Sequence, residues 1–135
     1  MSRSIRTLLL ALTVIALTVG AARGDVTRST LRDVSLAVLA LYNAGDGLGL
    51  RDRISAPLAS RLSVESLMER LSDCQRRFGN LQRLSLPVAS SETAALFAAY
   101  FEGGTRDMYL EVDRDGRIRL LTFSGLGESC AVIAP

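Results

Sequence analysis

The chain contains no histidine, lysine or tryptophan, and only two of its 135 residues are cysteines. Without histidine, neither a Ser-His-Asp nor a Cys-His catalytic arrangement can form, and no imidazole can bind a metal. Two cysteines are also too few for a zinc knuckle or an iron–sulfur site. Aromatic residues make up just 5% of the chain. These absences exclude several chemistries before the rest of the sequence favours any.

Residues 1–24 have the order of a secretory signal peptide. Two arginines precede the apolar run 8–19, and small residues follow it. This succession is typical of a cleaved export signal. The uncharged stretch 7–22 is shorter than a membrane-spanning helix, which needs about 20 residues. An uncleaved signal anchor is the alternative interpretation. We expect a periplasmic or secreted protein, with cleavage after Ala22 or Gly24.

Removal of the signal peptide would change the charge of the protein. The whole chain has 16 arginines and 14 acidic residues, for a net charge of +2. A cut after Gly24 leaves 13 arginines against the 14 acidic residues, a net charge of −1. A nearly neutral domain gives no support for binding to nucleic acid or to a membrane surface. The remaining arginines are interpreted as solvated, with an anionic partner as the alternative.

The chain after residue 24 divides into a helical half and a strand half, which predicts an α+β domain. Apolar residues at helical spacing predict a helix over 27–43, and a shorter helix is expected over 48–54. Ser63, a good N-cap, begins a third helix, and Gly79 suits its end. The helices should cover one face of the sheet that follows.

Alternating residues predict four strands, which we place at 81–88, 93–102, 105–113 and 117–124. Short turns join them, so we expect N-terminal helices packed on a curved antiparallel meander sheet that resembles a cone. The domain should span residues 25–124, and residues 125–135 are interpreted as a C-terminal tail.

Two hairpin turns set the register of this sheet. A two-residue turn at Gly103-Gly104 would pair Phe101 with Arg106. For the second hairpin, a turn with a glycine bulge over 114–116 would pair Val112 with Ile118 and Glu111 with Arg119. A two-residue turn would shift that register by one. We prefer the first register because it sets unlike charges opposite each other.

These registers assign the two faces of the sheet. The inner face would be almost wholly apolar and would pack on the helices; it comprises Phe97, Ala99, Phe101, Met108, Leu110 and Val112. Together with Tyr42 of the first helix, four of these residues are the candidates to line a pocket: Phe97, Phe101, Met108 and Leu110. The outer face would hold an apolar patch, and such patches mark interfaces or ligand grooves. Its main residues would be Tyr100, Tyr109, Leu121 and Phe123. We expect a homodimer through this face unless the tail covers it.

Four stretches carry a resemblance to a known superfamily: LAVLALYNAGD, SAPLASRLSVESLMERL, FGNLQRLSLP and DRDGRIRLLTFSG. They resemble small exported bacterial domains of the nuclear-transport-factor-2-like, cystatin-like cone fold, within a group of uncharacterised domains sometimes found beside serine-hydrolase-type domains. The resemblance covers most of residues 28–124. The superfamily includes steroid isomerases, polyketide cyclases and many non-catalytic binding proteins. None of the enzymes' catalytic motifs matches this chain, so no residue role is carried over.

The two cysteines predict a structural disulfide. In an exported protein a cysteine pair most often forms one bond, with two separate buried thiols as the alternative. Cys74 lies on the inward stripe of the third helix, and the tail that carries Cys130 is free to fold back toward it. We therefore predict a Cys74–Cys130 bond that attaches the tail to the helices, with Cα atoms within about 7 Å.

No catalytic constellation is evident in the sequence. Asp46, Asp52 and Asp73 are interpreted as solvated or capping residues, and Tyr42 as a core residue with a satisfied hydroxyl. The Asp113-Arg114-Asp115-Gly116 segment lacks the later ligands of a calcium loop, so we predict no metal and no cofactor. The favoured hypothesis is an exported non-enzymatic domain that binds a small apolar ligand or a protein partner. The alternative is a small enzyme of the isomerase, cyclase or hydrolase-accessory kind in the same fold.

Overall fold

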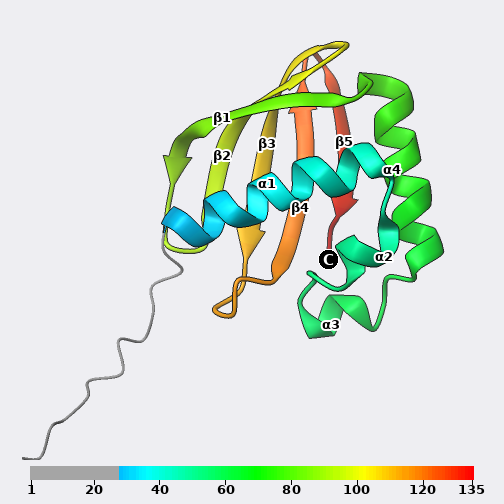
Figure 1. The fold of residues 1–135 in the computed structure, drawn as a ribbon, viewed down its shortest axis with the longest axis vertical. Coiled ribbons are helices and arrows are strands. Elements are labelled where there is room, and N and C mark those ends of the chain that lie inside the picture. Colours follow the sequence, from blue (N-terminus) through cyan, green and yellow to red (C-terminus); the bar gives the residue numbers. More distant parts are fainter. Residues whose placement is uncertain (1–27) are drawn as a thin grey trace, which may run out of the picture.

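The structure is a computed structural model that describes residues 28–135. Helices come first in the chain, and a five-stranded antiparallel sheet follows (Figure 1). The helices pack against the sheet, so the predicted α+β class is confirmed. The expected signal peptide lies outside the described residues.

Four helices precede the sheet: α1 (Arg28–Ala44), α2 (Gly47–Arg51), α3 (Ala56–Ala59) and α4 (Val64–Phe78). As predicted, Ser63 caps α4, its Oγ accepting a hydrogen bond from the Ser66 backbone N–H at 3.1 Å. Gly79 ends α4 with a φ of 76°, a conformation that favours glycine.

The short helix ends earlier than predicted, because the chain after α2 pairs with the sheet. The Ile118 N–H donates to the Arg53 carbonyl at 2.7 Å, and the Ser55 N–H donates to the Ile118 carbonyl at 2.9 Å. These bonds use backbone groups that a longer helix would need. They also place the next short helix, α3, beside the sheet.

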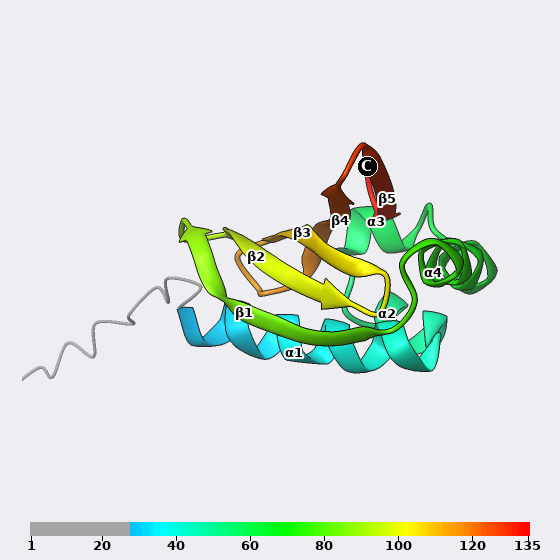
Figure 2. The same cartoon turned by 90° about the horizontal axis from the view of Figure 1, so that it is seen from above.

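The sheet is a meander in the order β1 (Leu81–Ser90), β2 (Ala94–Phe101), β3 (Gly104–Val112), β4 (Ile118–Gly125) and β5 (Glu128–Ile133). Figure 2 shows its curvature, with α1 running along one side of it. The fifth strand corrects the expected C-terminal tail. A two-residue turn with positive φ at Leu126 (54°) and Gly127 (80°) returns the chain antiparallel to β4.

The first hairpin turns one residue earlier than predicted. Phe101 pairs with Gly104 rather than with Arg106, so Glu102-Gly103 forms the turn. The Gly103 N–H donates to the Phe78 carbonyl at 2.9 Å, and a Cβ on Gly103 would lie 2.9 Å from that same oxygen. Contact with the end of α4 therefore requires glycine in the turn. Since each partner moves by two residues, the two faces of the hairpin are unchanged.

The inner face of the hairpin is buried, as predicted. The aromatic rings of Tyr42, Phe78, Phe101 and Phe123 contact one another with centroids 5.1 to 5.5 Å apart. The five candidate pocket-lining residues, Tyr42, Phe97, Phe101, Met108 and Leu110, all belong to this packed core. They fill the interior of the curved sheet with side chains.

The second hairpin corrects the outer face. Val112 pairs with Ile118 as predicted, but Glu111 pairs with Leu120, so Arg119 forms a bulge. Beyond a bulge the alternation of side chains is reversed. Leu121 and Phe123 are therefore 0% exposed, in the core, and not on the outer face where we expected them. The expected ion pair nevertheless forms, with Arg119 Nη1 3.4 Å from Glu111 Oε1.

The two cysteines form the predicted disulfide, with Cα atoms 5.7 Å apart. It links α4 to β5, and Cys74 and Cys130 are 0% and 6% exposed. A buried disulfide indicates a non-cytoplasmic, oxidising compartment. Among the described residues, no helix has the length and apolar character that would be needed to cross a membrane.

Candidate functional site

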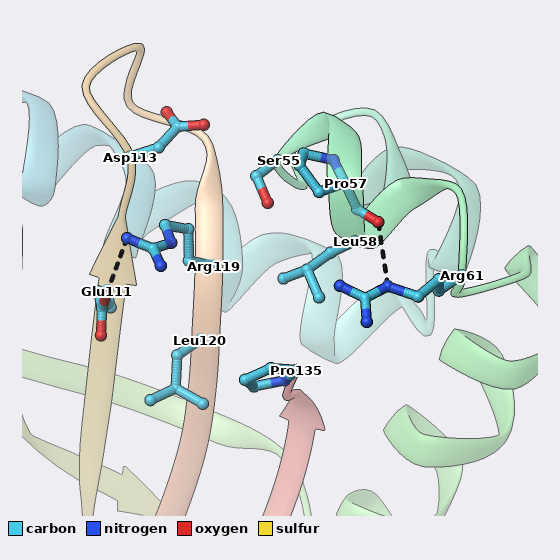
Figure 3. Close-up of a pocket in the computed structure, with 9 residues that line it drawn as sticks. All are labelled: Ser55, Pro57, Leu58, Arg61, Glu111, Asp113, Arg119, Leu120 and Pro135. Atoms are coloured by element: carbon cyan, nitrogen blue, oxygen red, sulfur yellow. Dashed lines mark hydrogen bonds and ion pairs between the residues drawn. The ribbon is translucent and has the colours of Figure 1, made fainter.

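A groove of about 420 Å³ lies between α3 and the β3–β4 hairpin (Figure 3). Its walls combine apolar and charged side chains from three separate parts of the chain. They are Ser55, Pro57, Leu58, Arg61, Glu111, Asp113, Arg119, Leu120 and Pro135. A concave site with a few convergent polar groups is the usual form of a small-molecule site.

Backbone pairing positions the two walls. The bonds between residues 53–55 and Ile118 fix the start of α3 against the beginning of β4. Leu58, which is buried, then anchors α3 in the core. The groove is thus held by backbone hydrogen bonds and by packing rather than by a loop.

Arg61 projects into the groove from the α3 side (Figure 3). Its Nε donates to the Pro57 carbonyl at 3.4 Å, a long hydrogen bond that orients the side chain. In the described part of the chain, its guanidinium makes no ion pair. By contrast, Arg119 on the opposite wall pairs with Glu111.

Ser55 is a buried polar residue, 5% exposed, at the upper end of the same groove. Its side chain makes no capping hydrogen bond to α3, and Figure 3 shows the hydroxyl directed into the groove. Within residues 28–135 the hydroxyl has no hydrogen-bond partner. The Ser55 oxygen is not among the enclosed, unpartnered side-chain atoms of the described residues, so it is open to solvent from the groove and available to a ligand there.

The two acidic residues of the groove already have partners. Glu111 carries the ion pair with Arg119. Asp113 Oδ1 accepts hydrogen bonds from the backbone N–H groups of Asp115 and Arg117, each at 2.9 Å, and so closes the β3–β4 turn. Asp113 serves the turn that the sequence predicted at this position, and it lies at the end of the groove away from Arg61 (Figure 3).

Tyr42 lies away from the groove, in the core. Its hydroxyl donates to the Gly79 carbonyl at 3.0 Å. Burial raises the pKa of the Tyr42 phenol above its usual value. A phenol that keeps its proton and is already hydrogen-bonded to the end of α4 is a structural group, as predicted from the sequence.

Sequence reasoning did not find this groove. The segments 55–61 and 111–120 are far apart in the chain, and neither contains a recognisable motif. The described residues include no group of three or more cysteine or acidic side chains that could hold a metal ion. Comparison with protein-family models, curated proteins and solved structures finds no match to this chain. The geometry of the groove is therefore the basis for assigning a function.

Proposed function

We propose that the chain is an exported, non-catalytic domain that binds a small amphipathic ligand in the groove between α3 and the β3–β4 hairpin. The observation that carries this proposal is that Arg61 lines the same groove as the apolar side chains of Leu58 and Leu120. Among the described residues, Arg61 has no carboxylate partner. A ligand with one polar end and one apolar end would satisfy both Arg61 and the apolar side chains. It would also offer a hydrogen-bond partner to the Ser55 hydroxyl, which opens into the groove.

The packed core supports a site at the rim rather than inside the sheet. An apolar ligand enclosed by the sheet would need space that Phe97, Phe101 and Met108 occupy. The alternative, a small enzyme, would need an inward acid–base pair beside such a space. Tyr42 is the inward phenol, and its raised pKa and its bond to Gly79 oppose a role as a base.

Export is supported by the buried disulfide together with the signal-peptide pattern of residues 1–24. Mass spectrometry of the intact protein from its native host should find a mature chain that begins at Arg23 or Asp25. Retention of Met1 would contradict a cleaved signal. The helices and curved antiparallel sheet also support the proposed kinship with the nuclear-transport-factor-2-like superfamily.

Ligand binding can be tested by mapping NMR chemical shifts while mixtures of small amphipathic compounds are added to the purified protein. We expect shifts in the backbone amides of the groove. The variant Leu120→Trp should fill the groove and abolish them. Leu96→Trp makes the same change on a half-buried position of β2 outside the groove, so it should have no effect. Shifts that appear elsewhere, or that survive Leu120→Trp, would refute the proposed site.

A homodimer through the outer face of the sheet stays a prediction, with a corrected set of residues. Tyr109 is 37% exposed there, and Leu120 and Thr122 take the places expected for Leu121 and Phe123. Sedimentation of the wild type and of Tyr109→Glu should show a concentration-dependent dimer that the substitution disrupts. A wild type that is monomeric across micromolar concentrations would contradict the prediction.

A further inference from the structure

We infer that the ligand of this groove carries a carboxylate, which the Arg61 guanidinium binds with the Ser55 hydroxyl as a further donor. The apolar part of the ligand would lie against Leu58 and Leu120. This inference rests on the proposed function, because it names the chemical class that the groove accepts.

The surroundings of Arg61 are the first argument. Arg76, Arg77, Arg106 and Arg119 each lie within salt-bridge distance of a carboxylate. Arg61 is exposed and, like Arg53 and Arg83, has no such partner among the described residues, but it lines the groove and its one hydrogen bond uses Nε. The two terminal nitrogens remain free to donate. A guanidinium presents a flat fork of N–H groups that matches the two oxygens of a carboxylate.

Ser55 provides the second argument, which is independent of charge. Its hydroxyl makes no hydrogen bond in the described structure, and its oxygen is open to the groove although the residue as a whole is 5% exposed. An oxygen of a bound carboxylate would satisfy this donor. A ligand without such an oxygen would cover the hydroxyl and leave it unpaired, which is unfavourable.

The acidic residues of the groove do not oppose this assignment. Glu111 is paired with Arg119, and Asp113 accepts two backbone hydrogen bonds at the far end of the groove. A carboxylate at Arg61 would therefore lie away from Asp113. The apolar walls favour a short hydrocarbon chain attached to the carboxylate, and each methylene that they bury should tighten binding about fourfold.

Hexanoate and hexanamide are matched probes, because they have the same chain and differ in the charge of the head group. Each would be titrated into the purified protein while NMR shifts of the groove amides are followed. We expect hexanoate to bind at least tenfold more tightly than hexanamide. Hexyl phosphate is the third probe: its phosphate also fits the guanidinium fork, but it is bulkier and carries up to two negative charges in a groove that also holds Glu111 and Asp113, so we expect it to bind more weakly than hexanoate.

Four variants test the assigned donors. Arg61→Gln should weaken hexanoate binding at least tenfold, whereas Arg53→Gln, the same change on a neighbouring exposed arginine outside the groove, should leave it unchanged. Arg61→Lys keeps the charge but not the fork, and it should also weaken binding. Ser55→Ala should weaken binding severalfold. Amide spectra that match the wild type will show that each variant is folded.

The outcomes separate this inference from the proposed function. If hexanamide binds as well as hexanoate, or if Arg61→Lys binds like the wild type, the groove binds ligands but the assigned carboxylate contact is wrong. Tighter binding of hexyl phosphate than of hexanoate would overturn the inference in the same way. If neither these probes nor the compound mixtures shift the groove amides, both the inference and the proposed function fail.

Discussion

Loss of the disulfide should remove a large part of the stability of this domain. The Cys74–Cys130 bond closes a loop with a sequence separation of 56 residues. The chain-entropy relation for a loop of this length gives about 4 kcal/mol of stabilisation, mainly through restriction of the unfolded chain. Domains of this size are stable by about 5–15 kcal/mol in total. The variant with Cys74→Ala and Cys130→Ala should therefore be folded at best marginally.

The side-chain hydrogen bonds between α4 and β5 are too weak to replace the bond. Arg70 Nη1 donates to the Val132 carbonyl at 3.4 Å, and Arg77 Nη1 donates to the Ser129 carbonyl at 3.2 Å. Hydrogen bonds of this kind contribute about 1 kcal/mol each in a favourable geometry. Since Cys74 is fully buried, its replacement by alanine also removes packed atoms from the core.

Urea unfolding followed by circular dichroism measures the effect. With a slope of about 2 kcal/mol per molar, a loss of 4 kcal/mol lowers the midpoint by about 2 M. The wild type with a reductant is the matched control, and its midpoint should fall by a similar amount. If the midpoint falls by less than about 0.5 M and the slope is unchanged, loop closure does not dominate the stabilisation.

Three further changes test other parts of the structure. The raised pKa of Tyr42 means that its contribution to stability is complete below pH 10 and is lost as the pH rises above 10, where the unfolded chain releases the phenol proton. The free energy of unfolding should therefore fall by up to about 1.4 kcal/mol per pH unit above pH 10. In urea titrations, Tyr42→Phe should reduce this fall. Leu126 is 81% exposed at positive φ, so Leu126→Asn should raise the free energy of unfolding by about 1 kcal/mol, and a loss would contradict the assigned turn. Arg106 is buried over the Phe78 ring, with an unpartnered Nε and a 3.5 Å contact to Glu128. Arg106→Met should therefore leave the free energy of unfolding unchanged or raise it. A decrease of more than about 2 kcal/mol in the free energy of unfolding would show that the ion pair is stabilising.

The elements that could be predicted from the sequence are those with strong local signals. Ser63 and Gly79 mark the ends of α4, and the helical stripe of Cys74 placed that residue inward, which was enough to pair it with Cys130. Two-residue alternation assigned the inner face of β2 and β3 even though the turn was wrong. A register error of two residues keeps each side chain on its face, and that explains why the assignment of the faces is correct.

The elements that were missed depend on contacts between distant residues. The short helix ends at Arg51 because Ile118, far along the chain, pairs with the segment after it. The strand β5 follows a turn with a leucine at positive φ, which the usual turn residues would not indicate. The early turn of the first hairpin depends on the hydrogen bond from the Gly103 N–H to the Phe78 carbonyl, a contact between two elements that are separated in the chain.

The bulge at Arg119 connects the largest error in the predicted sheet with the groove that the sequence did not reveal. In a regular strand, neighbouring side chains point to opposite faces. Here Arg119 and Leu120, which are adjacent in the chain, both line the groove. The bulge makes this possible, and it also turns Leu121 and Phe123 into the core. One extra residue in β4 thus supplies both a charged and an apolar contact to one wall of the groove, and it buries the side chains that would have made the outer face strongly apolar. The β3–β4 turn keeps the predicted pairing of Val112 with Ile118, and the bulge just after it shifts the rest of β4 by one residue from the register that this turn alone would set.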